Sequence, residues 1–231
     1  MFKTNNEKHS VVKRMIQVWM ILFFQIAILF AAAGSIEWVR AWIFVILQGG
    51  LLIVFGSVML RVNPELIGQR SKMKSDIEKY DKLFAIAYSP VLFVTPAVAG
   101  LDFRFGWSGM PFSSIGVGIP LATLGYLLIM WAMAVNTYFE TGVRIQKDRG
   151  HQVCTKGPYQ YVRHPGYVGM VLMYAGTPLI LGSWWAFLPA GVVVPLLVIR
   201  TALEDRMLHN ELTGYADYAQ RVKYRLLPGV W

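Results

Sequence analysis

One segment of the chain, residues 157–169, combines residue types that lipid-facing helices rarely contain. Its sequence, GPYQYVRHPGYVG, brings together an arginine, a histidine, three tyrosines, two prolines and three glycines. Prolines and glycines interrupt a regular helix, and cations are costly in hydrocarbon. A polar ligand site at a membrane surface could use all of them. The segment therefore favours an enzyme over a purely structural membrane protein.

The residue types of this segment suit an anionic and aromatic ligand. Pro165 disfavours helix at His164, so the next helix should begin near Gly166, with free backbone amides that can bind an anion. Arg163 could add a bidentate grip on a carboxylate. Flat faces for an adenine or a sulfonium are offered by Tyr159, Tyr161 and Tyr167. The alternative is an interfacial belt of anchoring side chains, which we prefer for any one tyrosine but not for the whole string.

A second candidate group follows the last apolar segment. Arg200 and Glu204 are one helical turn apart and share a face. A solvated ion pair would look the same, but partial burial at a membrane surface makes these charges expensive and favours a function. The tail, residues 215–231, is rich in tyrosine. It either caps a cavity or rests on the lipid headgroups, and the sequence leaves both readings open.

Long apolar segments must position these residues. The chain is 55% hydrophobic and 15% charged, whereas soluble domains carry about a quarter charged residues. Residues 15–36, 39–60, 83–101 and 114–139 are each long enough to span a bilayer as a helix. Residues 167–182 and 184–199 are shorter and should form a hairpin turned at Gly182. We therefore expect an all-α integral membrane protein with about six transmembrane helices, a cofactor loop and a C-terminal helix.

The placement of the basic residues predicts the topology. Of the 22 lysines and arginines, all except Arg40 and Arg104 lie before the first span, in the connectors after the second and fourth spans, or after the sixth. The positive-inside rule then puts both termini and the candidate site in the cytoplasm of a multi-pass protein, in the inner or plasma membrane if the source is prokaryotic. The net charge of +9 is thus a topology signal, so a nucleic-acid partner is disfavoured. The first apolar run is too long for the core of a cleaved signal peptide.

Two parts follow from this layout. Residues 1–105 form two transmembrane hairpins joined by a connector, residues 61–82, in which Asn63 and Pro64 predict a helix start. The mixed charges that follow suit a helix lying on an anionic membrane surface. Residues 114–231 carry the chemistry: a cofactor loop at 140–169, a helical hairpin at 167–199 and a tail at 200–231.

The sequence lacks the motifs that are typical of several other kinds of site. No GxGxxG element follows a strand, so a Rossmann domain is not supported. HExxH and CxxC are also missing from the sequence. Cys154 is the single cysteine, which excludes an intrachain disulfide, and the four histidines show no recognised ligand spacing. We therefore expect no metal.

Two motifs carry a resemblance to a known family. They are GHQVCTKGPYQYVRHPGYVG at residues 150–169 and RTALEDRML at residues 200–208, closed by YRLLPGVW. Over residues 136–231 the chain resembles the isoprenylcysteine carboxyl methyltransferase family in its broad sense, prokaryotic members included, and the related phospholipid methyltransferases. Family members usually show two glutamates where this chain has Glu204 and Asp205, which leaves the role of Asp205 open.

The resemblance implies an integral-membrane methyltransferase that uses S-adenosyl-L-methionine and acts on a lipid-like acceptor. It places Arg200 nearest the acceptor and Glu204 beneath the cofactor. The other residues that it implies for the cofactor pocket are His151, Val153, Gly157, Tyr159, Arg163, His164, Pro165 and Tyr167. A carboxylate acceptor, which we favour, is already ionised and needs a cation such as Arg200 for orientation. An amine acceptor, as in phospholipid N-methylation, would need an acid such as Glu204.

Two other functions compete with methyl transfer. A membrane oxidoreductase resembling the sterol reductases, whose tails end similarly, would bind NADPH. A lipid-binding or transport protein would place polar groups at mid-membrane. The apolar segments contain few of these, among them Gln25, Gln48 and Asn136. The concentrated polarity is interfacial, which counts against transport.

Overall fold

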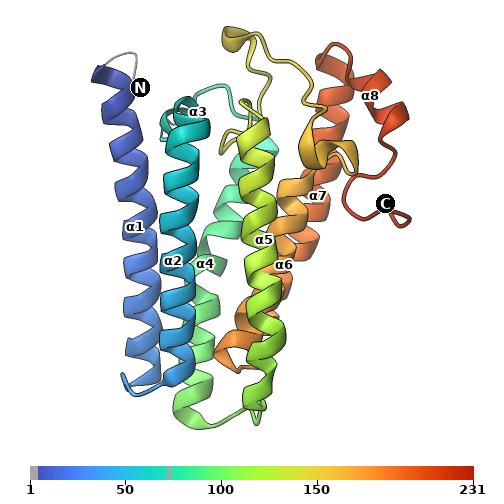
Figure 1. Cartoon of the computed structure of the whole chain (residues 1–231). Helices are drawn as coiled ribbons and strands as arrows, with labels where there is room; N and C mark the ends of the chain where they lie inside the picture. The colour runs from blue at the N-terminus through green and yellow to red at the C-terminus, as the bar shows by residue number, and fades with distance from the viewer. Residues whose placement is uncertain (1–4, 72–73) are drawn as a thin grey trace.

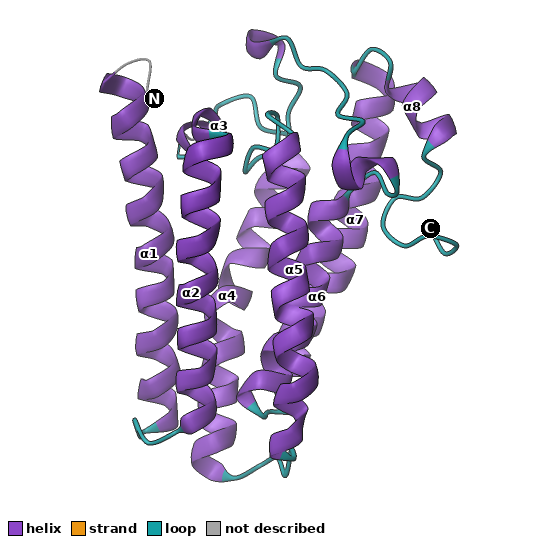
Figure 2. Ribbon diagram, viewed as in Figure 1, coloured by secondary structure: helices purple, strands orange, loops and turns teal. Residues whose placement is uncertain are grey.

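The computed structural model describes residues 5–71 and 74–231, and the regular elements of this part of the chain are all helices (Figure 2). Five are long: α1 (Asn5–Ala33), α2 (Val39–Val62), α4 (Lys79–Phe105), α5 (Ile115–Val135) and α7 (Phe187–Glu211). Three are shorter: α3 (Pro64–Gln69), α6 (Pro165–Leu181) and α8 (Tyr215–Arg221). Three 3-10 turns lie at Phe112–Ser114, Lys147–Arg149 and Gly157–Gln160. The expected all-α class without a Rossmann domain is confirmed.

The long helices match most of the expected spans. α1, α2, α4, α5 with its preceding 3-10 turn, and α7 are long and apolar enough to cross a membrane. α6 has 17 residues, or about 26 Å at 1.5 Å per residue, and falls short of that length. The predicted hairpin forms, with Gly182 at φ +79° ending α6. The fourth span ends at Val135, earlier than expected, because Asn136 leaves the helix in an extended conformation.

The helices stand side by side, and their polar connections gather at one end (Figure 1). This end, here called the polar end, carries the start of α1, α3, the loop between α5 and α6, and α8. The turns after α1, α4 and α6 point the other way. The arrangement agrees with the grouping of the basic residues in the sequence. Two of those residues, Lys3 and Lys72, lie outside the described part of the chain.

The connector between α2 and α4 differs from its prediction. The helix start is confirmed, because the side chain of Asn63 accepts a hydrogen bond from the Leu66 amide and Pro64 occupies the first turn. However, α3 has 6 residues, and the described charged residues before Lys79 are not helical. The expected surface helix is therefore wrong. Instead, this charged segment turns back toward the loop between α5 and α6, where the Glu78 amide donates to the carbonyl of Val143 at 3.0 Å.

α5 and α6 pack closely through facing glycines (Figure 1). A Cβ added to Gly125 would lie 2.5 Å from the carbonyl oxygen of Gly169, and one added to Gly169 would lie 2.6 Å from that of Gly125. Gly118 and Gly176 face each other in the same way, with 2.9 Å and 2.6 Å. Small residues let helix backbones approach within a membrane. This close pair carries Tyr167 at its polar end and so fixes one wall of the site.

Candidate active site

A cavity of about 470 Å³ opens at the polar end, between the helix ends and the loop that joins α5 to α6. Most of the expected site residues line it: His151, Val153, Tyr159, Arg163, His164, Tyr167, Arg200 and Glu204. Two expected residues are not among its lining. Gly157 packs against Trp131 and Val135 of α5, and Pro165 is buried as the first residue of α6. Tyr161 is 65% exposed, which fits the anchoring interpretation.

Arg200 and Glu204 project from α7 into this cavity and meet different partners. The hydroxyl of Tyr167 donates a short hydrogen bond to the Glu204 carboxylate. The Nε of Arg200 lies 2.8 Å from Asp81 Oδ1, an ion pair with the first turn of α4. The Arg200 guanidinium also covers the rings of Phe84 and Tyr167, at 4.3 Å and 5.2 Å from their centroids. The two side chains are therefore not paired with each other, contrary to a simple surface ion pair.

Asp205 holds together the parts of the sequence that surround the cavity. Its carboxylate is 1% exposed and takes Arg163 in a bidentate contact, at 2.8 Å and 2.9 Å. It also accepts from the Tyr215 hydroxyl at 2.7 Å and from Arg225 Nε at 2.8 Å, and the Nε2 of His164 lies 3.4 Å away. The position that the sequence left open is thus a structural clamp.

The Asp205 clamp changes the interpretation of Arg163. Its remaining nitrogen, Nη1, donates to the carbonyls of Val222 and Lys223, both at 2.9 Å. All three guanidinium nitrogens are therefore engaged within the chain, and the expected bidentate grip on a ligand carboxylate is directed at Asp205 instead. Arg163 touches the cavity as part of its wall.

The tail docks on Arg163 and His164 of the first motif. The amides of Arg163 and His164 donate to the carbonyls of Tyr224 and Arg225, both at 2.9 Å. Tyr215 and Tyr218 line the cavity, and the Tyr218 hydroxyl donates to the carbonyl of Tyr159 at 2.7 Å. Of the two readings of the tail, the structure supports the cap.

The loop between α5 and α6 is held by a network of charges. Arg144 is buried and pairs with Glu140, Asp148 and Asp76, whose hydrogen bonds raise its pKa. Within this loop, Lys147–Arg149 form a 3-10 turn that ends at Gly150 with φ +61°. These contacts give a segment without strand pairing a defined path over the cavity.

His151 stands in this loop as an uncharged ring. It stacks against Tyr138, with 4.6 Å between ring centroids, and its Nδ1 accepts from the Gln146 amide at 3.4 Å. Burial lowers the pKa of His151 to about 4. The ring is therefore neutral at physiological pH, and its Nε2–H can donate a hydrogen bond.

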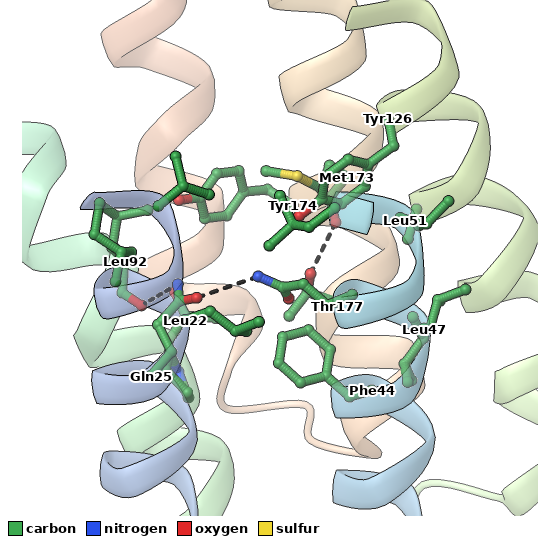
Figure 3. Close-up of a pocket in the computed structure, with 18 residues that line it drawn as sticks. Leu22, Gln25, Phe44, Leu47, Leu51, Leu92, Tyr126, Met173, Tyr174 and Thr177 are labelled. Carbon is green, nitrogen blue, oxygen red and sulfur yellow. Dashed lines mark hydrogen bonds between the residues drawn. The ribbon is translucent and has the colours of Figure 1, made fainter. Parts of the chain in front are cut away.

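A second, apolar cavity of about 170 Å³ lies deeper in the bundle, between α1, α2, α4, α5 and α6 (Figure 3). Ile21 and Leu92 line both cavities, so the two adjoin. Its polar groups are few. Gln48 donates to Gln25 at 3.1 Å, and Gln25 donates to the carbonyl of Leu92 at 3.0 Å (Figure 3).

Sequence reasoning missed the contribution of the N-terminal half to the site. Asp81, Phe84 and Tyr88 of α4, Arg14 of α1 and Arg70 after α3 all line the larger cavity. Asp81 gave a usable signal, since an acid beside a long apolar run needs a partner and Arg200 needs a counter-ion. No pattern in the sequence connects Arg14 or Arg70 with residues more than a hundred positions away. Among the described residues, no group of histidines, cysteines and acids could hold a metal ion.

Residues 113–213 match the phospholipid methyltransferase family model. The chain is also 30% identical over 109 residues to protein-S-isoprenylcysteine O-methyltransferase B of Arabidopsis thaliana, which covers 46% of this chain and 55% of the relative. Part of the chain is therefore similar to isoprenylcysteine methyltransferases. Probable protein-S-isoprenylcysteine O-methyltransferases of Oryza sativa, subspecies indica and japonica, are 27% identical over 114 residues, or 46% of this chain and 57% of each relative.

The matches confirm the methyltransferase resemblance drawn from the two motifs. The chain spans about half the length of the curated methyltransferases that it matches. The family model ends at residue 213 and begins at residue 113, so it includes α6, α7 and the loop before them. α1 to α4, with Arg14, Arg70 and Asp81, lie outside it.

Proposed function

We propose that this chain is an integral-membrane methyltransferase that uses S-adenosyl-L-methionine to methylate a lipid-like acceptor, with the carboxylate of an isoprenoid or prenylcysteine-type molecule favoured. One observation carries the proposal. Arg200, Glu204, Tyr167 and His151 line a single cavity at the polar end, and that cavity adjoins an apolar one inside the helix bundle.

The donor set of the larger cavity fits S-adenosyl-L-methionine. The volume lies within the usual range for small-molecule sites, about 300–1,000 Å³. The rings of Tyr138, Tyr159 and Tyr167 line it and suit an adenine or a sulfonium. The Glu204 carboxylate can balance a positive charge, and the neutral His151 adds no repulsion to it. These residues would hold the cofactor.

The chain mainly has to orient the reactants. S-adenosyl-L-methionine, when bound, supplies a methyl group that passes to an acceptor oxygen as the sulfur–carbon bond breaks, which leaves a neutral thioether and moves no proton. Arg200 is held by Asp81, Thr141 and two rings, so its guanidinium is pre-oriented toward an acceptor carboxylate. The docked tail and the loop over the cavity would exclude water.

An amine acceptor is the second candidate, because the family model that matches is that of phospholipid methyltransferases. In that case a proton has to leave the amine, and the Glu204 carboxylate, which accepts a hydrogen bond from Tyr167, is placed to take it. Mass spectrometry of membrane lipids with and without the protein separates the two. A mass gain of one methylene on a carboxylate lipid supports the first, and the same gain on an amine headgroup supports the second.

The setting of the two cavities suggests how the reactants arrive. We place the polar end in the cytoplasm, on the charge pattern, so that the water-soluble cofactor enters from that side. The acceptor would enter sideways from the membrane, with its tail toward the apolar cavity lined by Leu22, Phe44 and Leu51 (Figure 3).

Cofactor binding tests the proposal directly. Titration of the purified protein in detergent should show saturable binding of S-adenosyl-L-methionine and none of NADPH. The reverse result would favour the sterol-reductase-like oxidoreductase. Binding of neither would remove the enzymatic proposal.

Two variants test the assigned roles within the site. Arg200→Ala should lower turnover more than cofactor affinity, because Arg200 faces the acceptor. His164→Ala should lower cofactor affinity, because its ring stacks on Tyr167 with 5.6 Å between centroids. Arg206→Ala, an exposed position on the same helix, is the matched control. Wild-type kinetics in both site variants would remove these assignments.

A further inference from the structure

Two arginines of the larger cavity differ from the other three in having no acidic partner. Arg14 of α1 and Arg70 after α3 both line it, and both lie outside the segment that matches the methyltransferase family. Among the described residues, no carboxylate lies within ion-pair distance of either. By contrast, Arg144, Arg163 and Arg200 pair with Glu140, Asp205 and Asp81 respectively.

The hydrogen bonds and the ring contact that Arg14 and Arg70 make are with neutral groups. Arg14 reaches the amide oxygen of Gln17 at 3.5 Å. Arg70 donates to the carbonyl of Phe139 at 2.8 Å, and its guanidinium lies 5.5 Å from the centroid of that ring. Glu140 is nearby but is already held by Arg144 and by Arg149.

The two arginines act on each other electrostatically. Burial, together with the charges of Arg14 and Arg200, lowers the pKa of Arg70 to about 9, although Tyr167 and Glu140 act in the opposite direction. Burial and like charges therefore outweigh the anions that act on Arg70. An oxyanion between the two guanidinium groups would remove the repulsion, with the fork geometry that carboxylates and phosphates prefer.

One face of α1 runs from Arg14 into the helix bundle. Arg14 and Ile21 line the larger cavity. Val18, Ile21, Leu22 and Gln25 line the apolar one, and these spacings place them all on one helix face. From Arg14 to Gln25 this face is about 16 Å long at 1.5 Å per residue. An anionic headgroup followed by an apolar tail matches that order.

We propose that Arg14 and Arg70 form an anion-binding subsite for the acceptor, which holds a carboxylate or phosphate oxyanion of its headgroup while the tail follows α1 into the apolar cavity. That the bound molecule is the methyl acceptor rests on the proposed function, whereas the presence of an anion-binding subsite does not. It narrows the acceptor class to anionic amphiphiles. It also gives the N-terminal half, which the family match does not cover, a role in substrate choice.

Direct binding of simple probes tests the subsite without turnover. The protein would be purified in an uncharged detergent and titrated with dodecyl phosphate, dodecanol and inorganic phosphate, with binding followed by calorimetry. We expect dodecyl phosphate to bind, and the other two to bind at least about tenfold more weakly, since each lacks half of the recognised chemistry. Equal binding of dodecanol would overturn the anion site. Equal binding of inorganic phosphate would overturn the amphiphile assignment and point to a free anion.

Variants tie the binding to the two arginines. Arg14→Gln and Arg70→Gln should each weaken dodecyl phosphate binding about tenfold, while Arg70→Lys should retain part of it. Arg61→Gln is the matched control, because Arg61 is an exposed arginine at the same end of the bundle. Wild-type affinity in the Arg14→Gln/Arg70→Gln double variant would overturn the proposal.

S-adenosyl-L-methionine binding, measured on the same preparations, separates this proposal from the proposed function. Retained cofactor binding in the arginine variants shows that they are folded, so a loss of dodecyl phosphate binding is then specific. If one of these variants fails to fold, the Arg70→Lys variant and the comparison of probes on the wild-type protein still test the anion-binding subsite. Failure of all preparations to bind the cofactor would count against the methyltransferase, while the amphiphile titration would still decide the subsite.

Discussion

At the scale of single residues, Asp205 carries an unusual share of the contacts around the site. A carboxylate that is almost fully buried accepts from two arginines and a tyrosine. Such a group is costly to bury, and the cost is offset only while every partner remains in place. The family resemblance placed Glu204 beneath the cofactor, whereas its neighbour Asp205 holds together the wall of the same cavity.

Replacing this carboxylate should therefore affect stability before chemistry. In Asp205→Asn the amide nitrogen cannot accept, so Arg163 and Arg225 lose part of their charge compensation, and we expect a loss of about 3 kcal/mol in unfolding free energy. Thermal unfolding in detergent measures it. Asp217→Asn, an exposed acid on α8, should stay within about 0.5 kcal/mol of the wild type. Equal stability of the two variants would contradict the clamp.

The second residue-scale prediction concerns pH. Because burial lowers the pKa of His151 to about 4, the ring should stay neutral from about pH 5.5 upward. The unfolded chain takes up this proton first as the pH falls, so the contribution of His151 to stability is present above its unfolded pKa and is lost between about pH 6.5 and 4. Cofactor affinity should likewise show no step assigned to His151 above about pH 5.5.

His151→Gln separates this ring from its acidic neighbours. Glu204 and Glu140 line the same cavity, and the variant leaves both in place. A decline in affinity in acid that persists in His151→Gln does not come from the His151 ring. An inflection near pH 6.5 in the wild type, absent from the variant, would show that the ring titrates as an exposed histidine does.

At the scale of elements, the α5–α6 pair sets the position of Tyr167 and His164. Gly125→Ala would place a methyl group 2.5 Å from a backbone oxygen of α6, so the helices must separate. We expect a destabilisation of about 1–3 kcal/mol, together with weaker cofactor binding. Gly116→Ala on the same helix meets nothing within 4 Å and is the control for the change in helix propensity. Similar melting temperatures for both would show that the pair tolerates a wider spacing.

The elements also show how far the sequence predicts this fold and where it stops. Apolar runs of bilayer length placed the long helices, and Pro165 and Asn63 marked helix starts correctly, because these signals are local. The charged connector after α3 was wrongly expected to be helical, since its charges pair with the loop between α5 and α6 rather than along a helix face. Most of the predicted site residues line one cavity. Gly157 and Pro165 lie outside its lining, against α5 and at the start of α6.

What the sequence could not predict is contact between distant segments. Asp81 pairs with Arg200, and Arg70 donates to the carbonyl of Phe139, although each pair is widely separated along the chain. Such pairs depend on helix rotation and tilt, which apolar composition alone does not determine. From the sequence, the N-terminal helices are therefore indistinguishable from ordinary membrane spans. The structure shows that some of their residues line the larger cavity.

At the scale of the whole molecule, the charge asymmetry predicts an orientation that labelling can test. In a Cys154→Ser background, a cysteine at Glu37, in the exposed turn between α1 and α2, should react with a membrane-impermeant maleimide applied to intact cells. A cysteine at Lys147, exposed in the loop over the cavity, should react only after permeabilisation. The opposite pattern would reverse the topology and the proposed side of cofactor entry.

The docking of the tail has a consequence for biosynthesis. The amides of Arg163 and His164 bond to carbonyls some sixty positions further on, at Tyr224 and Arg225. The membrane helices can insert while the ribosome is still translating, but this wall of the cavity cannot close until residue 225 has left the exit tunnel. A translation product that stops after α7 would thus be an inserted bundle with an open site. Assembly of the cavity therefore follows insertion of the helices.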